Sequence, residues 1–219
     1  MTERLGLIIG NRIYSSWSLR GWLLARQSGL DFDCEVVPLR QPDTAARIRA
    51  RSPAGRVPAL IDGGLVVWDS LAIAEYLAER APKAGIWPAE SAARAVARSA
   101  CAEMHSGFAA LRQAWPMNLK RRGPALAADE ATAADITRIV ALWADCRDRF
   151  GACGDFLFGA WSAADAFYAP VVSRFLSYEA DIDAAARAYC EAVWSHPYMA
   201  EWRAGAEGEI WAIEAIDAL

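Results

Sequence analysis

The pattern of hydrophobic and polar positions changes character near residue 81. Before that point, short apolar runs typical of β-strands alternate with stretches in which apolar residues recur at helical spacing. The predicted strands are Leu5–Ile9, Cys34–Val37, Ala59–Ile61 and Leu65–Trp68, and the predicted helices are Leu19–Gln27, Pro42–Arg51 and one that begins behind Asp69-Ser70. Ser18 is the expected N-cap of the first helix and Gly29 its expected end. Asp62-Gly63-Gly64 between two apolar runs predicts a hairpin, so the order is β-α-β-α-β-β-α.

Beyond residue 81 the strand signals stop. Residues 81–88 hold two prolines and a glycine, which is typical of a linker. Alanine-rich helical patterns follow at residues 90–115, 130–149, 162–177, 184–195 and 198–208. We therefore expect a chain of the α+β class with a first domain at 1–80, a linker at 81–90 and an all-helical domain at 91–219.

The composition of the chain limits the kinds of binding partner and the cellular compartment that we expect. The 219 residues include 23 basic and 27 acidic side chains, a formal charge of −4, which argues against nucleic acid as a partner. No apolar run approaches the roughly 20 residues of a membrane span, and the N-terminal sequence MTERLGLIIGNR lacks the pattern of a signal peptide. The five cysteines show neither CxxC nor Cys/His spacing, so we expect no metal site and no disulfide framework. A cytoplasmic protein with reduced thiols fits these features.

The densest polar segment follows the first predicted strand and reads NRIYSSWS at residues 11–18. It holds four hydroxyl side chains just ahead of a helix: Tyr14, Ser15, Ser16 and Ser18. A helix N-terminus stabilises an anion through unpaired N–H groups and the helix dipole, and a hydroxyl can donate a hydrogen bond to the same anion. The alternative is that these residues only cap the helix and fill the loop.

Two further segments carry possible binding chemistry. If the Val57–Pro58 bond is cis, the N–H and C=O of Val57 face outward and could pair with a peptide-like ligand, although trans is far commoner for X–Pro bonds. Asp69 and Ser70 stand where a strand ends and a helix begins. They either cap that helix or bind an amino-acid head group, with the carboxylate on its ammonium.

Together these segments resemble the soluble glutathione transferases over essentially the whole chain. Residues 56–60, RVPAL, are similar to the family's (K/R/Q)VP-L segment, whose proline is cis. Residues 68–77, WDSLAIAEYL, are similar to its (E/D/Q)S-AI--YL segment, and residues 159–170, GAWSAADAFYAP, to its --S-AD----P helix start. The resemblance implies a thioredoxin-like first domain, an all-helical second domain, glutathione as co-substrate, a homodimer and a cytoplasmic role in detoxification.

The resemblance also implies residue roles at the thiol. Ser15 matches the serine of the zeta-like SSCS loop, whose hydroxyl faces the glutathione sulfur, with Ser16 and Tyr14 as alternatives. Trp17 replaces the cysteine of that loop. This departure puts zeta-type isomerase activity in doubt and excludes cysteine-type thiol transfer at this position.

The remaining contacts follow from the same resemblance. Val57, next to Pro58, would pair with the cysteinyl backbone of glutathione, and Asp69 with Ser70 would hold its γ-glutamyl end. The glycyl carboxylate would be held by one of three polar residues: Arg40, Gln41 or Arg56. The electrophile pocket would draw on three residues that could equally belong to the core: His105, Phe108 and Trp115.

Three functions remain open. The first is conjugation of glutathione to a small hydrophobic electrophile, and the second is glutathione-dependent cis–trans isomerisation of a maleylacetoacetate-type diacid. The third is a non-catalytic binding protein, because a fold does not fix a function.

Charge is unevenly distributed. Residues 1–80 carry 10 basic and 9 acidic side chains, and residues 40–56 hold five arginines against the single acid Asp43. This segment is either a positive wall that attracts an anionic thiol or a solvated helix face.

Overall fold

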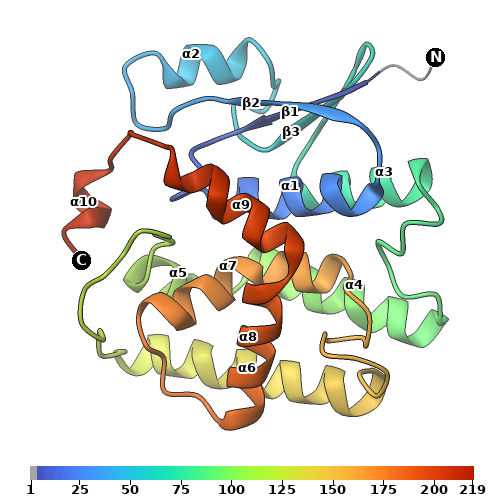
Figure 1. Ribbon diagram of the computed structural model, residues 1–219, viewed down its shortest axis with the longest axis vertical. Coiled ribbons are helices and arrows are strands. Elements are labelled where there is room, and N and C mark those ends of the chain that lie inside the picture. The colour runs from blue at the N-terminus through green and yellow to red at the C-terminus, as the bar shows by residue number, and fades with distance from the viewer. Residues whose placement is uncertain (1–3) are drawn as a thin grey trace.

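The computed structural model describes residues 4–219, so the first three residues of the predicted 1–80 domain lie outside the described part. The first third of the chain forms the predicted order of strands and helices (Figure 1). Its elements are β1 (Leu5–Ile9), α1 (Ser16–Ser28), β2 (Phe32–Val36), α2 (Thr44–Arg49), β3 (Ala59–Asp62), β4 (Leu65–Trp68) and α3 (Ser70–Arg80).

The strands form one mixed sheet in the order β2-β1-β3-β4. β1 pairs in parallel with β2 and antiparallel with β3, and Asp62 pairs with Leu65, so Gly63 and Gly64 close the predicted hairpin. Side chains of β1 alternate between the two faces of the sheet. Leu7 belongs to the core cluster that contains α1, whereas Ile8 packs with Ile48 of α2. The sheet lies between α2 and α1 (Figure 1).

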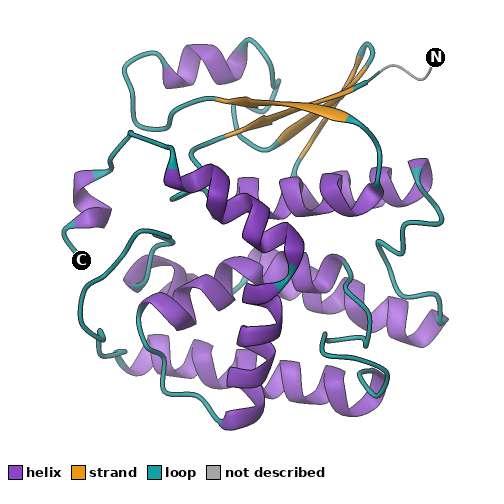
Figure 2. Cartoon of the chain, in the orientation of Figure 1, coloured by secondary structure: helices purple, strands orange, loops and turns teal. Residues whose placement is uncertain are grey.

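The rest of the chain is helical, as predicted (Figure 2). Its helices are α4 (Ser91–Ser106), α5 (Ala109–Ala114), α6 (Glu130–Phe150), α7 (Ala163–Ser177), α8 (Ala184–Ser195), α9 (Pro197–Glu207) and α10 (Glu214–Asp217). The α+β class with a thioredoxin-like sheet part and a helical second part is confirmed. Within residues 4–219 no helix is both long and apolar enough to cross a membrane. All five cysteines are free.

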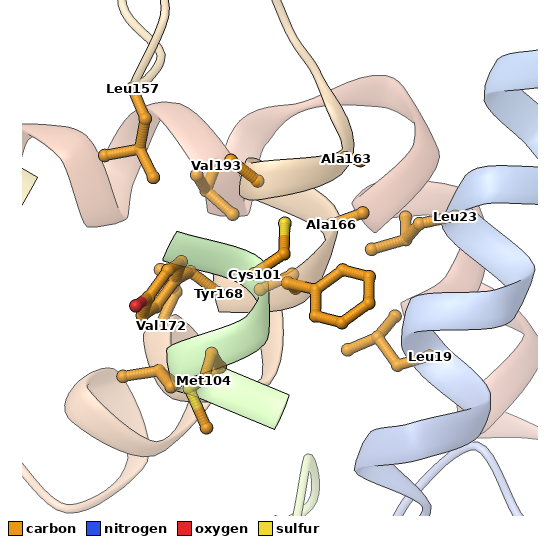
Figure 3. Close-up of a cluster of buried hydrophobic side chains, with 14 of the residues drawn as sticks. Leu19, Leu23, Cys101, Met104, Leu157, Ala163, Ala166, Tyr168, Val172 and Val193 are labelled. Atoms are coloured by element: carbon orange, nitrogen blue, oxygen red, sulfur yellow. The ribbon is translucent and has the colours of Figure 1, made fainter. Parts of the chain in front are cut away.

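A single hydrophobic core joins the two parts. Leu19 and Leu23 of α1 face Cys101 and Met104 of α4 and the side chains of α7 (Figure 3). Because α1 is packed on the helical part, the loop that precedes α1 is held at the junction of the two parts.

The central helix α7 begins at the predicted capping box of Ser162 and Asp165. Asp165 is fully buried and accepts hydrogen bonds from the N–H groups of Leu157 and Ser162 and from the Tyr189 hydroxyl. Burial raises the pKa of Asp165 to about 6 despite these donors, since a buried carboxylate loses its hydration. The motif therefore starts a helix in the core, away from solvent.

The structure corrects the predicted start of α1 and confirms its end. The N-cap of α1 is Ser15 rather than Ser18, and its side chain accepts a hydrogen bond from the Ser18 N–H. Ser18 lies inside the helix, where its hydroxyl bonds back to the preceding loop. Gly29 ends α1 in the left-handed conformation, as predicted.

The predicted helix at 90–115 is two helices. Gly107, the residue that follows α4, has an extended backbone, and Phe108 takes the left-handed conformation with φ 57°. The helical spacing of apolar residues continues through this break, so periodicity alone does not reveal it. The short helix α10 was not predicted, and α2 is shorter than the predicted Pro42–Arg51.

Candidate active site

A cleft of about 880 Å³ opens where the sheet part meets the helical part. The sheet part contributes the start of α1, the segment before β3 and the junction of β4 with α3, which together form the sheet wall of the cleft. The helical part contributes the helical wall, which consists of His105 at the end of α4 and Arg112 of α5. The lining side chains most relevant to chemistry are Ser15, Trp17, Arg56, Val57, Trp68, Asp69, Ser70, His105 and Arg112.

Ser15 is the N-cap of α1 and borders the cleft. Its Oγ lies 2.7 Å from the Oγ of Ser18 and 3.4 Å from the Ser18 backbone nitrogen. The Ser18 Oγ in turn accepts the Gly10 N–H at 2.9 Å. Since hydroxyl groups both donate and accept, Ser18 can donate to Ser15 and leave the Ser15 proton free for a ligand.

The two neighbouring candidates, Tyr14 and Ser16, do not border the cleft. The Tyr14 hydroxyl donates to the carboxylate of Asp217, 2.9 Å from both oxygens, and accepts the N–H of Ile213. Burial and the Asp217 carboxylate raise the pKa of Tyr14 to about 12. Tyr14 therefore points to the C-terminal segment, and Ser15 is the candidate hydroxyl that reaches the cleft.

The Val57–Pro58 bond is cis, and both residues border the cleft. Among the contacts of residues 4–219, the N–H and C=O of Val57 have no hydrogen-bond partner. Pro58 packs so closely on α1 that a Cβ on Gly21 would lie 2.8 Å from its ring. The segment is therefore fixed against α1 while it keeps a free peptide edge.

Asp69 caps α3 from a left-handed conformation with φ 74°, which is strained for a residue with a side chain. One carboxylate oxygen accepts the Leu71 N–H at 2.8 Å, and the other lies 3.3 Å from Nε2 of His105. The neighbouring Ser70 hydroxyl is buried and lacks a hydrogen-bond partner in the described part of the chain. Ser70 borders the cleft, so its hydroxyl is close to any ligand that binds beside Asp69.

The cleft is aromatic and cationic where Trp17 of α1 meets His105 and Arg112 of the helical part. The Trp17 ring centroid lies 5.2 Å from the guanidinium carbon of Arg112 and 4.7 Å from that of Arg20. The His105 ring meets it edge-on at 4.9 Å. Burial, and then repulsion from Arg112, lowers the pKa of Arg20 to about 9. Nε and Nη1 of Arg20 have no hydrogen-bond partner within residues 4–219, so no acceptor offsets the positive charge on these two nitrogens beside the Trp17 ring.

Some predicted site residues lie elsewhere. Of the three candidates for the glycyl carboxylate, Arg56 borders the cleft, whereas Arg40 and Gln41 do not. Phe108 and Trp115 are buried in the core, and Trp115 stacks on Tyr178 at 5.3 Å. Of the three predicted electrophile-pocket residues, His105 alone lines the cleft, whereas Phe108 and Trp115, on either side of α5, are part of the core.

The basic segment 40–56 is mostly a solvated surface. Arg47 pairs with Asp43 at 3.8 Å and Arg51 with Glu35 at 3.2 Å, and of its five arginines Arg56 borders the cleft. Arg112 was missed from the sequence, because no local pattern indicates that an arginine in a short helix faces a cleft on another part of the fold.

Comparison with known proteins agrees with this geometry. Residues 14–80 match the glutathione S-transferase N-terminal domain family. A probable maleylacetoacetate isomerase from Caenorhabditis elegans is 30% identical over 100 residues, which is 44% of this chain and 47% of that protein. Glutathione S-transferase Z2 of Arabidopsis thaliana is 32% identical over 102 residues, 44% of this chain and 46% of that protein. The matched segment thus spans less than half of each curated relative.

The structural similarity extends over the whole chain. A glutathione transferase homologue from Burkholderia gl BGR1, solved with bound glutathione, superposes with a TM-score of 0.72 at 22% identity. The superposition covers 94% of this chain and 100% of that one. At this identity the match establishes the fold. Residues 14–80 thus match the glutathione S-transferase N-terminal domain by sequence, and nearly the full chain shares the fold of a glutathione transferase homologue.

Proposed function

We propose that the protein is a glutathione transferase that binds glutathione, stabilises its thiolate and conjugates it to a small electrophile. In this proposal residues 1–80 bind glutathione and residues 91–219 bind the electrophile, with 81–90 as a linker. The observation that carries the proposal is the Ser15 hydroxyl, which lies in the cleft at the N-terminus of α1, beside the free peptide edge of Val57.

Each part of glutathione finds a complementary group on the sheet wall. The unpaired N–H and C=O of Val57 suit the cysteinyl backbone, which would add as a short antiparallel strand. The Asp69 carboxylate suits the γ-glutamyl ammonium, and the Ser70 hydroxyl, which lacks a partner in residues 4–219, suits the γ-glutamyl carboxylate. Arg56 at the rim suits the glycyl carboxylate.

The energetics of thiolate formation need no general base. A free thiol has a pKa of about 8.5, so about 3% is ionised at pH 7, and lowering it by about two units takes about 2.7 kcal/mol. One hydrogen bond to a charged acceptor supplies about 1.5–3 kcal/mol. The N-terminus of α1 adds about 0.3–1 kcal/mol.

In the reaction, Ser15 donates a hydrogen bond to the sulfur and does not itself become a nucleophile. The thiol proton leaves to solvent when glutathione binds. The thiolate then forms a carbon–sulfur bond with the electrophile, and the leaving group departs with the electron pair of the broken bond. Ser15 Oγ donates to Ser18 Oγ at 2.7 Å. When the Ser15 proton turns to the sulfur, the Ser18 hydroxyl can donate to Ser15 in its place, because a hydroxyl both donates and accepts.

Substitution of Ser15 tests the proposal. Ser15→Ala should lower kcat/KM with a chromogenic electrophile by about 10- to 100-fold, since it removes one charged hydrogen bond. Ser16→Ala is the matched control, because Ser16 does not border the cleft, and it should retain activity. Full activity in Ser15→Ala would refute the serine mechanism. Failure of the native protein to bind millimolar glutathione would favour a non-catalytic binding protein.

A second candidate is glutathione-dependent isomerisation of a maleylacetoacetate-type diacid, favoured by one observation. Arg112 borders the cleft, and its guanidinium has no carboxylate partner in the described chain. This cation suits a carboxylate on the second substrate better than a neutral hydrophobic group. Turnover of a cis diacid without net consumption of glutathione would select the isomerase over the conjugating enzyme.

We also propose a cytoplasmic homodimer. Leu65 and Trp68, on the edge strand β4, are about half exposed at 48% and 47%, and edge strands with exposed apolar groups favour association. Light scattering during size-exclusion chromatography would give twice the 23.8 kDa chain mass. A mass of one chain at micromolar concentration would refute the dimer.

A further inference from the structure

The loop that delivers Ser15 is held by a carboxylate from the far end of the chain. Glu209, just after α9, is 7% exposed, and its Oε1 accepts the Arg12 N–H at 2.9 Å. Its Oε2 accepts the Ile13 N–H at 3.3 Å. The Arg12 guanidinium lies 3.6 Å from the same carboxylate. One buried side chain therefore fixes two consecutive peptide groups that lie 197 and 196 residues away in the sequence.

The carbonyl groups of the same loop also accept hydrogen bonds from distant parts of the chain. The Trp202 indole N–H donates to the Arg12 carbonyl at 3.1 Å, and the Leu119 N–H donates to the Ile13 carbonyl at 3.2 Å. The Ser15 N–H closes the loop on the Asn11 carbonyl at 2.9 Å. The N–H and C=O groups of Arg12 and Ile13 are thus all bonded to the second part of the chain, two residues before Ser15.

The Glu209 contact is energetically demanding. A carboxylate taken out of water needs charged or strongly polar partners, and a backbone N–H taken out of water needs an acceptor. Glu209 meets both needs at once. An amide in its place would offer one acceptor oxygen, and its NH₂ group would face the second N–H as another donor. The site therefore requires two acceptor oxygens on one side chain, which an amide does not supply.

We propose that Glu209 is a positioning residue for Ser15, and that its carboxylate holds the Arg12–Ile13 peptides so that the Ser15 hydroxyl stays aimed at the thiolate. The inference rests on the proposed function and deepens it. Hydrogen bonds to a developing charge act fully only when donor and acceptor are preorganised, and a loop without this anchor would lose that alignment. The far C-terminal segment is then part of the thiolate machinery, although it does not line the cleft.

The test is the pH dependence of kcat/KM for glutathione in Glu209→Gln. We expect the pH midpoint to rise by roughly 0.5–1 unit and KM for glutathione to increase by about three- to tenfold, as one charged hydrogen bond is weakened. Asp217→Asn is the matched control: it alters the same C-terminal segment, but Asp217 contacts the Tyr14 hydroxyl and Asn118 rather than the loop backbone. Its midpoint should equal that of the native protein.

A native midpoint and native KM in folded Glu209→Gln would overturn the proposal. If that variant does not fold, amide hydrogen exchange of the native protein decides instead. Binding and anchoring are reciprocally linked, so saturating glutathione should slow exchange at Arg12 and Ile13, and unchanged exchange would overturn the proposal. Failure of the proposed function is distinct, because the native protein would then bind no glutathione by calorimetry.

Discussion

The two walls of the cleft are built in different ways. The sheet wall combines backbone features, the start of α1 and the Val57–Pro58 segment, with the side chains of Ser15 and Asp69, which cap α1 and α3. The helical wall is made of two side chains, His105 at the end of α4 and Arg112 in α5. Backbone features recognise a peptide through its own N–H and C=O groups, whereas side chains change with single substitutions. In the function that we propose, the sheet wall therefore binds the constant ligand, glutathione, and the helical wall binds the variable electrophile.

The walls also differ in how firmly each is held. Pro58 packs on Gly21 of α1, and Glu209 and Trp202 hold the loop before α1. Arg112 is anchored on one side only, by Nη1 bonds to the carbonyls of His105 and Gly107 at 3.5 and 3.2 Å. The remaining nitrogens of its guanidinium face no carboxylate within the described residues, and burial lowers its pKa. We expect substitutions in the two walls to separate the kinetics of the two substrates.

The largest effect is expected at Asp69. Asp69→Ala should raise KM for glutathione by about 10- to 100-fold, since it removes one charged contact, and the lost cap should lower the free energy of unfolding by about 1 kcal/mol. Asp69→Asn keeps a capping side chain and should lose binding but little stability. Calorimetric titration and urea unfolding separate these effects. Equal glutathione affinity in all three proteins would break the assignment of the ammonium to the sheet wall.

A smaller effect is expected at Arg112. Arg112→Gln should lower kcat/KM by about tenfold for an electrophile that carries a carboxylate, as one charged hydrogen bond is lost. An uncharged electrophile of the same reactivity provides the control and should react at the native rate. Steady-state kinetics with the matched pair measure the difference. An equal loss of kcat/KM for both electrophiles would mean that the helical wall does not recognise the carboxylate of the electrophile.

Packing of the sheet wall is tested at Gly21. Gly21→Ala places a Cβ 2.8 Å from the Cβ and Cγ of Pro58, so we expect unfolding to require about 1–3 kcal/mol less free energy, with a higher KM for glutathione. Gly208→Ala is the control, because a Cβ there meets no atom within 4 Å. Urea unfolding of both variants gives the comparison. A native free energy of unfolding in Gly21→Ala would show that the Pro58 segment can shift to accept the added Cβ at little cost.

The smallest effect is expected at Tyr14, which lies next to Ser15 but faces away from the cleft. Tyr14→Phe should lower the free energy of unfolding by about 0.5–1 kcal/mol and leave the activity midpoint unchanged. The folded protein raises the pKa of Tyr14 from 10.0 to about 12. The hydroxyl therefore stabilises the fold fully below pH 10, and its contribution is lost as the pH rises through 12. Unfolding at pH 8 and pH 11 measures this, and a shifted activity midpoint would implicate Tyr14 in thiol chemistry.

Local patterns predicted the parts of the fold that depend on neighbouring residues. Gly63 and Gly64 mark a hairpin because a two-residue turn needs glycine, and Ser162 with Asp165 marks a helix start because both cap N–H groups. The break at Gly107 was missed because the apolar spacing continues through it. The cap at Ser15 was placed three residues late, since either serine satisfies the capping pattern.

The sheet wall could be predicted from sequence because its features lie in short contiguous segments. Ser15, Val57 and Asp69 each sit at a strand or helix end that sequence signals reveal, and the structure brings all three to one cleft. Arg112 and Glu209 could not be predicted. Their placement depends on how helices distant in the sequence pack against the β1–α1 loop, and neither residue lies in a local motif.

The central claim is that Ser15 lowers the pKa of the glutathione thiol, and ultraviolet titration of the thiolate in the bound complex measures this directly. Native protein should give a midpoint about two units below the value of about 8.5 for a free thiol. Bound to Ser15→Ala, glutathione should titrate within about half a unit of the free thiol. A native midpoint at the free-thiol value, or one that Ser15→Ala leaves unchanged, would contradict the account.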